Sequence, residues 1–299
     1  MEGTIYKAIS DFYYVKTQNN NKYTCKARGV FKNEDIKPLV GDHVVFQVID
    51  YDRREGVIDE IMPRKNSLIR PAVANVDQAM VVFAVRDPNP NYSTLDRFLV
   101  LMKKQNIPTI IVFNKRDLAH VDDVKNLKKL YSKSGCKVFF TSVGAENRHV
   151  LWLKRALKNK VTVMAGPSGV GKSTLLNSLT RDIYDDSQEK AKVGDISART
   201  GRGKNTTRHN ELFDLGGGYQ IIDTPGFTSL LVSGDDYTRD ELKEAFPEFY
   251  PYEDKCPFKD CKHIKERDCA VRKAVDEGKI PLSRYNSYKS IYDEIKTTR

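Results

Sequence analysis

The sequence has no long hydrophobic run. Within its 299 residues, no apolar stretch reaches the roughly 18 residues that a membrane-spanning helix requires. The opening segment Met1–Lys7 lacks the apolar core of a secretory signal peptide. These absences predict a cytoplasmic protein without membrane partners. The composition, 39% apolar and 30% charged residues, fits a soluble globular chain.

Acidic residues are too few to balance the basic ones. The chain carries 40 Asp and Glu against 50 Lys and Arg, a formal net charge of +10. A basic excess of this size favours a polyanionic partner, most simply a nucleic acid. A surface charge that only keeps the protein soluble is the alternative interpretation.

Cysteine is also scarce, and its count of five is odd. An odd count in a chain expected in the reducing cytoplasm argues against a disulfide framework. Cys256, Cys261, His263 and Cys269 form the pattern C-x4-C-x-H-x5-C. Three thiolates and one imidazole suit one structural, tetrahedral Zn²⁺ ion, because four protein ligands leave no open position for catalysis. Free cysteines beside an incidental histidine are the alternative.

The N-terminal region has the pattern of short strands. Alternating apolar and polar residues occur at 3–9, 23–27, 43–48 and 54–61. Such alternation predicts a small closed β-barrel of about five strands, with the oligonucleotide-binding barrel as one form. Basic residues interleave with four tyrosines, a mixture suited to RNA phosphates and stacked bases. An ordinary β-module with core aromatics is the alternative, and the tyrosines are Tyr6, Tyr13, Tyr14 and Tyr23.

Alternating strands and helices follow from about residue 76. Buried strands are predicted at 79–85, 109–113, 137–140 and 161–165. Helices are predicted at 92–105, 122–134, 147–158, 237–246, 270–276 and 283–295. The alternation predicts a parallel sheet covered on both faces. Three consecutive glycines at 216–218 predict a hairpin between strands at 210–215 and 218–223.

One stretch fits the phosphate-binding loop G-x-x-x-x-G-K-[ST]. It lies between a predicted strand and a predicted helix, which is the context that the motif requires. Backbone N–H groups and the helix N-terminus suit phosphate, while Lys172 would reach the β- and γ-phosphates and Ser173 would hold Mg²⁺. The stretch is Gly166, Pro167, Ser168, Gly169, Val170, Gly171, Lys172, Ser173 and Thr174.

A second motif predicts that the bound base is guanine. The sequence N-K-x-D follows the predicted strand at 109–113, as Asn114, Lys115, Arg116 and Asp117. A carboxylate accepts two hydrogen bonds from guanine N1–H and its exocyclic amine, a pattern that adenine cannot offer. Asn114 is expected at the N7/O6 edge and the Lys115 stem against the base. A backbone amide near O6 is expected from Thr141, Ser142 and Val143.

Residues for Mg²⁺ and the γ-phosphate are expected in two further segments. The motif D-x-x-G begins at Asp223, which would hold Mg²⁺ through water, and ends at Gly226, whose N–H would meet the γ-phosphate. The segment 184–208 has no apolar periodicity and is expected to be a functional loop. Its Thr207 is preferred over Thr206 as the Mg²⁺-sensing threonine, and two ordinary loop threonines are the alternative.

The residue after D-x-x-G departs from ordinary GTPases. Many of them place a glutamine there to orient the attacking water, whereas this chain has Phe227. Intrinsic hydrolysis is therefore expected to be slow. We expect a group from the loop or from a partner to complete the site, with His209 as one candidate. A polar residue at a strand edge is the alternative for His209.

The order of the motifs is permuted, because N-K-x-D precedes the phosphate loop and D-x-x-G comes last. Permutation is tolerable since the termini of a domain usually lie close together. With these motifs, the N-terminal strands and the Cys/His cluster, essentially the whole chain resembles a known family. It is similar to the circularly permuted GTPases that depend on the small ribosomal subunit, the small ribosomal subunit biogenesis GTPase A family.

This resemblance implies an α/β fold in three parts. They are an OB-like RNA-binding barrel at 1–66, a circularly permuted P-loop GTPase domain at 67–232 and a zinc-binding helical domain at 233–299. It implies a monomer that binds GTP or GDP with Mg²⁺, binds the small (30S) ribosomal subunit and its rRNA, and hydrolyses GTP in late subunit maturation. The alternatives are a GTP-gated RNA chaperone with negligible hydrolysis and a GTPase acting on another nucleic acid such as tRNA.

Overall fold

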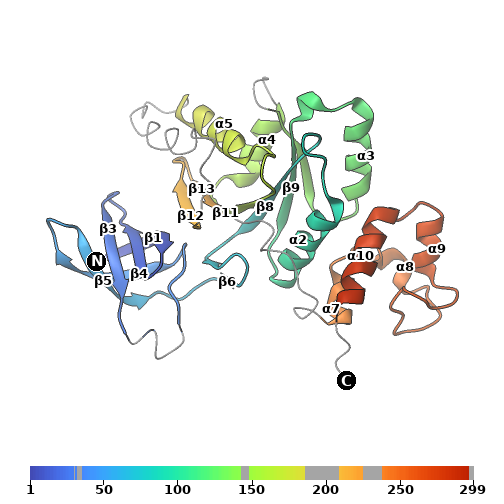
Figure 1. The fold of residues 1–299 in the computed structure, drawn as a ribbon, viewed down its shortest axis with the longest axis horizontal. Helices are drawn as coiled ribbons and strands as arrows, with labels where there is room; N and C mark the ends of the chain where they lie inside the picture. Colours follow the sequence, from blue (N-terminus) through green and yellow to red (C-terminus); the bar gives the residue numbers. More distant parts are fainter. Residues whose placement is uncertain (30, 32–35, 143–147, 186–208, 225–237, 296–299) are drawn as a thin grey trace. The chain divides into compact units, whose positions relative to one another are not determined.

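The computed structural model describes residues 1–29, 31, 36–142, 148–185, 209–224 and 238–295 (Figure 1). The chain divides into two compact units, which are described separately. The first contains Met1–Met80, Val150–Ala165 and Lys172–Phe227, and the second contains Val81–His149, Gly166–Gly171 and Thr228–Arg299. Several residues expected at the nucleotide lie outside the described residues: Val143, Thr206, Thr207, Gly226 and Phe227.

Five strands form a closed barrel in the first unit. They are β1 (Glu2–Ile9), β2 (Phe12–Lys16), β3 (Lys22–Ala27), β4 (His43–Asp50) and β5 (Glu55–Ile61). β1 pairs with β2 and β4, β2 with β3, and β5 with β3 and β4, so every strand has two neighbours within the barrel. The side chains of Ile5, Val15 and Phe46 point inward and are fully buried. The predicted OB-like barrel is confirmed, although the sequence analysis did not identify β2.

The four barrel tyrosines do not share one environment. Tyr13 and Tyr23 are only 4% and 8% exposed and belong to the barrel core, where the Tyr23 ring packs against Phe46. Tyr6 and Tyr14 are half-buried, and their ring centroids lie 6.2 Å apart. The core alternative therefore holds for two of the four, because successive side chains of a strand point to opposite faces.

Three more strands of the first unit extend from the barrel. β11 (Lys160–Ala165) runs parallel to β13 (Tyr219–Asp223), and β13 pairs antiparallel with β12 (Glu211–Asp214). The predicted hairpin is thus confirmed. β12 also pairs with β1 at the Lys7–Glu211 position, where the two side chains form a 3.2 Å ion pair. The unit also contains α5 (Lys172–Asp185) and nearly all of α4 (Arg148–Leu157).

The segment at 63–71 contains the first strand of a small two-stranded sheet. β6 (Ser67–Leu68) and β7 (Val73–Ala74) pair antiparallel. Before β6, the Arg64 guanidinium donates to both carboxylate oxygens of the fully buried Asp42, at 2.7 and 2.8 Å. This ion pair fixes the start of the segment to the barrel.

A parallel sheet forms the core of the second unit. β8 (Gln78–Ala84) is buried along its whole length and enters this unit at Val81. It lies beside β9 (Thr109–Asn114), which runs parallel to β10 (Lys137–Phe140). The helices of this part are α2 (Tyr92–Lys104) and α3 (Val121–Tyr131). No helix among the described residues of the chain is long and apolar enough to span a membrane.

The C-terminal part of the second unit is helical. It contains α7 (Arg239–Glu244), α8 (Tyr250–Glu253), α9 (Ala270–Asp276) and α10 (Leu282–Glu294), of which α8 was not predicted. α10 is held to α2 by Arg284, whose guanidinium contacts Asp96 and Glu248 at 2.6 Å each. All three side chains are at most 2% exposed, and the Tyr131 hydroxyl donates to the same Asp96 oxygen at 3.1 Å.

This buried network predicts a large cost for removing its cation. Arg284→Ala leaves two buried carboxylates without their partner, and breaking such a network typically costs about 3–5 kcal/mol. We expect a lower free energy of unfolding in urea denaturation of the full chain, followed by circular dichroism. Asn286→Ala, at an exposed position of the same helix, should leave the midpoint of the urea transition unchanged. If the two variants unfolded at the same urea concentration, this would contradict a stabilising role for the network.

Candidate nucleotide-binding and metal sites

The phosphate loop of the second unit passes so close to its neighbours that two positions have no room for a side chain. A Cβ at Gly166 would lie 2.2 Å from the carbonyl oxygen of Val82 on β8. A Cβ at Gly171 would lie 2.5 Å from Nδ2 of Asn114. Gly171 also has a φ of +89°, which glycine adopts readily and other residues rarely do. The spacing of the motif's glycines thus follows from contacts with β8 and β9.

Asn114 joins the N-K-x-D segment to the phosphate loop. It is 1% exposed at the end of β9, and its Nδ2 donates to the Val170 carbonyl oxygen at 3.0 Å. Its Oδ1 accepts a 2.9 Å hydrogen bond from the Thr141 hydroxyl. Both ends of the amide are therefore used. This contact sets the position of the loop, and Thr141 acts as a positioning residue for Asn114.

The rest of N-K-x-D turns away from the strand. Lys115 has a φ of +59°, and its ammonium group donates to the carbonyl oxygen of Asp87 in the segment after β8. Asp117 lies in a short 3-10 helix (Arg116–Leu118) and is exposed. The main chain of Arg116 donates to the Thr141 carbonyl oxygen at 3.0 Å. The carboxylate of Asp117 is thus held on a fixed turn with its oxygens accessible.

The first unit carries the charged residues expected at the phosphates. Lys172 begins α5, directly after Gly171 in the sequence, and Asp223 ends β13. Burial lowers the pKa of Lys172 and raises the pKa of Asp223, because each charged form loses water, while their mutual attraction opposes both shifts. The Thr224 hydroxyl donates to the Met164 carbonyl oxygen at 2.9 Å and ties the end of β13 to β11.

His209 and the hydroxyl residues of the motif are accessible. Ser173 and Thr174 are exposed in the first turn of α5, and His209 is exposed two residues before β12. Ser142 is half-buried after β10. An accessible Ser173 is compatible with binding a cation. The role of His209 stays a prediction.

Four residues of the second unit converge in the predicted metal cluster. The ligand atoms of Cys256, Cys261, His263 and Cys269 all lie within 4.8 Å of one another. The Cys256 and Cys269 sulfurs are 3.9 Å apart, and His263 Nδ1 lies 3.7 and 3.4 Å from them. A tetrahedral Zn²⁺ with zinc–sulfur distances of about 2.3 Å places sulfur ligands about 3.8 Å apart. The cluster therefore has the dimensions that such an ion requires.

The protonation of His263 also suits a cation. Burial lowers the pKa of His263 to about 4, so its imidazole is neutral and Nδ1 is available as a ligand. Burial raises the pKa of the Cys261 thiol to about 12, and a bound cation would stabilise the thiolate instead. Glu253 Oε1 is buried without a hydrogen-bond partner among the described residues and lies 3.8 Å from His263 Nε2. A carboxylate behind a histidine ligand is a common arrangement at metal sites.

Helix α10 holds the backbone of the cluster. The Tyr285 and Tyr288 hydroxyls donate to the carbonyl oxygens of His263 and Lys262, each at 2.7 Å. The Glu266 carboxylate accepts the main-chain N–H groups of residues 262, 264 and 265, which lowers its pKa despite partial burial. Local spacing predicted that these four residues would lie together, whereas nothing in the sequence pattern indicated the supporting residues.

Taken together, a phosphate loop held by the asparagine of N-K-x-D defines a P-loop GTPase, and the order of its motifs defines a circularly permuted one. Comparison with known families agrees. The family described as RsgA GTPase matches residues 61–233, and the family described as RsgA N-terminal domain matches residues 2–58. The chain belongs to the RsgA GTPase family and is a GTP-hydrolysing enzyme.

Relatives match along the whole chain. It is 43% identical over 306 residues to the "Small ribosomal subunit biogenesis GTPase RsgA" of Agathobacter rectalis, covering 99% of this chain and 98% of the relative. The protein of that name from Clostridium perfringens is 45% identical over 299 residues, covering 100% and 99%. The match includes the C-terminal region that contains the metal cluster.

Solved structures resemble the fold over the same length. The crystal structure of YjeQ from Thermotoga maritima is 34% identical, with a TM-score of 0.77 and coverage of 100% of this chain and 99% of that one. The structure of YloQ, described as a circularly permuted GTPase, is 35% identical, with a TM-score of 0.70 and coverage of 100% and 96%. These matches confirm the fold class predicted from the sequence.

The contact between Asn114 and the phosphate loop predicts a specific loss. Asn114→Ala removes the donor to Val170 and leaves buried polar groups unpaired, which typically costs about 1–3 kcal/mol. We expect the dissociation constant for GDP, measured by isothermal titration calorimetry, to rise at least about tenfold. The matched control is Asn126→Ala at an exposed position on α3, which should bind as the unchanged chain does. Unaltered affinity in Asn114→Ala would rule out this positioning role.

Proposed function

We propose that this chain is a GTPase that binds the small ribosomal subunit, is stimulated by it, and acts in its late maturation. The observation that carries this proposal is the 43–45% identity, over essentially full length, to proteins named small ribosomal subunit biogenesis GTPases. The net charge of +10 supports an RNA partner. The chain is proposed to act as a monomer in the cytoplasm.

Each motif residue receives a proposed role from its chemistry. Asp117 accepts two hydrogen bonds from guanine, and Lys172 neutralises charge on the β- and γ-phosphates. When bound with GTP, Mg²⁺ would offset the negative charge that develops on the phosphate oxygens. Ser173, Thr207 and Asp223 are proposed to hold this ion. The N–H of Gly226 is proposed to meet the γ-phosphate.

The remaining base contacts are proposed from the same motifs. Asn114 keeps the loop in place and is proposed to border the N7/O6 edge, while the Lys115 stem covers one face of the base. Arg116 follows in the same turn. The backbone of Thr141, Ser142 and Val143 is proposed to donate to O6. Discrimination against adenine would then depend on Asp117. Adenine offers that carboxylate only its amine, whereas guanine offers both N1–H and an amine.

The proposed domain organisation assigns one task to each part. Residues 1–66 form the RNA-binding barrel, 67–232 the GTPase domain and 233–299 the zinc-binding domain. The site lacks the usual glutamine, since Phe227 follows D-x-x-G. Stimulation by the subunit would fit a group from the loop or from the partner that completes the site, and His209 is the candidate within this chain.

Parallel turnover measurements test the proposed function. We expect slow GTP hydrolysis by the chain alone and a rise of at least about tenfold with isolated small subunits, because a completed site lowers the barrier by about 1.4 kcal/mol or more. Turnover is measured in the same way with large subunits and with tRNA for comparison. Stimulation by tRNA alone would favour the alternative nucleic-acid substrate, and subunit binding without any hydrolysis would favour the RNA chaperone.

The metal cluster is proposed to hold one structural Zn²⁺. Plasma mass spectrometry of the purified chain should find about one zinc per molecule, as expected for a four-ligand site. Cys261→Ser should lose the metal and reduce the helical signal of the C-terminal part. Cys136→Ser removes a thiol outside the cluster and should retain the metal. Full zinc content in Cys261→Ser would contradict the assignment.

A further inference from the structure

The outward face of the barrel combines lysines with one exposed and one half-buried ring. Phe12 is 43% exposed on β2 and pairs with Lys26 on β3, whose ammonium nitrogen lies 5.1 Å from the Phe12 ring centroid. Lys22 lies 5.5 Å from the ring centroid of Tyr6 in the same way. In single-stranded nucleic-acid sites, aromatic rings typically stack on bases while neighbouring cations contact the phosphates.

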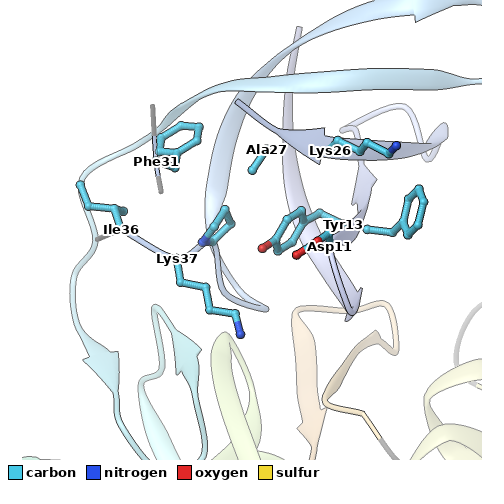
Figure 2. A pocket seen from close by; sticks show the side chains of 9 residues that line it. Asp11, Tyr13, Lys26, Ala27, Phe31, Ile36 and Lys37 are labelled. Carbon is cyan, nitrogen blue, oxygen red and sulfur yellow. The ribbon is translucent and has the colours of Figure 1, made fainter. Parts of the chain in front are cut away.

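A pocket of about 510 Å³ opens beside Phe12 at the turn between β1 and β2 (Figure 2). Its volume lies in the range of about 300–1,000 Å³ that is usual for sites of small organic ligands. Figure 2 shows Tyr13 and Asp11 lying next to each other, with Phe31 and Ile36 on the opposite side. The pocket is lined by Asp11, Phe12, Tyr13, Lys26, Ala27, Phe31, Ile36, Lys37 and Pro38.

The polar groups of the pocket differ in sign and position. The carboxylate of Asp11 and the ammonium groups of Lys26 and Lys37 are all on exposed residues. Burial, followed by the negative charges of Asp11 and Asp42, raises the pKa of Tyr13. A negative group among apolar walls disfavours a phosphate inside the pocket, while the lysines attract phosphates to its rim.

We propose that this pocket binds an unstacked guanine base of a single-stranded RNA segment. The aromatic side chains of the lining suit a base, and the Asp11 carboxylate accepts from guanine N1–H and the exocyclic amine. Uracil offers one such donor group, and adenine and cytosine offer one amine. Lys26 and Lys37 contact the flanking phosphates. The proposal rests on the proposed RNA-binding function of the barrel and adds a base preference to it.

Short RNAs with one variable base test this preference. The full chain, with its nucleotide site saturated by GDP, is titrated against labelled pentaribonucleotides UUNUU in fluorescence anisotropy. We expect the guanine form to bind about tenfold more tightly than the other three, the discrimination of one bidentate contact. Asp11→Asn should abolish this preference, whereas Lys37→Ala should weaken all four RNAs alike.

The matched control is Asp52→Asn, which removes the same charge from an exposed turn of the same barrel. It should keep the guanine preference. Equal binding of all four RNAs, a preference that survives Asp11→Asn, or binding of an acidic peptide that depends on the pocket in place of RNA would overturn the proposal. Subunit-stimulated GTP turnover, measured on the same proteins, separates such a failure from a failure of the proposed function.

Discussion

The structure depends on the close contact between the phosphate loop and the ends of two neighbouring strands. Gly166 lies against the backbone of β8, and Gly171 lies against the amide of Asn114. The hydrogen bond from Asn114 to Val170 then couples the N-K-x-D segment to the loop. Any side chain at either glycine would force these elements apart. A single buried amide thus connects the two motifs that define a guanine nucleotide site.

The sequence was most informative where chemistry is local. The phosphate loop, N-K-x-D and the Cys/His spacing each lie within a short segment, and the order of the segments was sufficient to predict the permutation. Most strands and helices were also predicted within a few residues. By contrast, β2 has the sequence Phe-Tyr-Tyr-Val-Lys, in which aromatic residues occupy both faces. Its alternation is therefore invisible in the sequence, and the burial of Tyr13 could not be distinguished from the partial exposure of Tyr14.

Contacts between distant segments were beyond sequence reasoning. Asp96 and Arg284 are 188 positions apart, and a charged residue on a helix is most often exposed. The Cys/His cluster was evident from spacing, but the Tyr285 and Tyr288 hydroxyls that fix its backbone come from α10. The same limit applies to Thr141, whose hydroxyl supports Asn114. Such partners become visible only when the chain is folded.

The Arg284 network also has an evolutionary consequence. Its three charged members lie on α2, on α10 and between α7 and α8, and all are buried. A relative in which only the arginine was replaced would keep two buried carboxylates without their cation. Substitutions at Asp96, Glu248 and Arg284 should therefore occur together. The C-terminal helices are consequently difficult to exchange for another module, and this part of the chain should have diversified mainly on its solvent-facing loops.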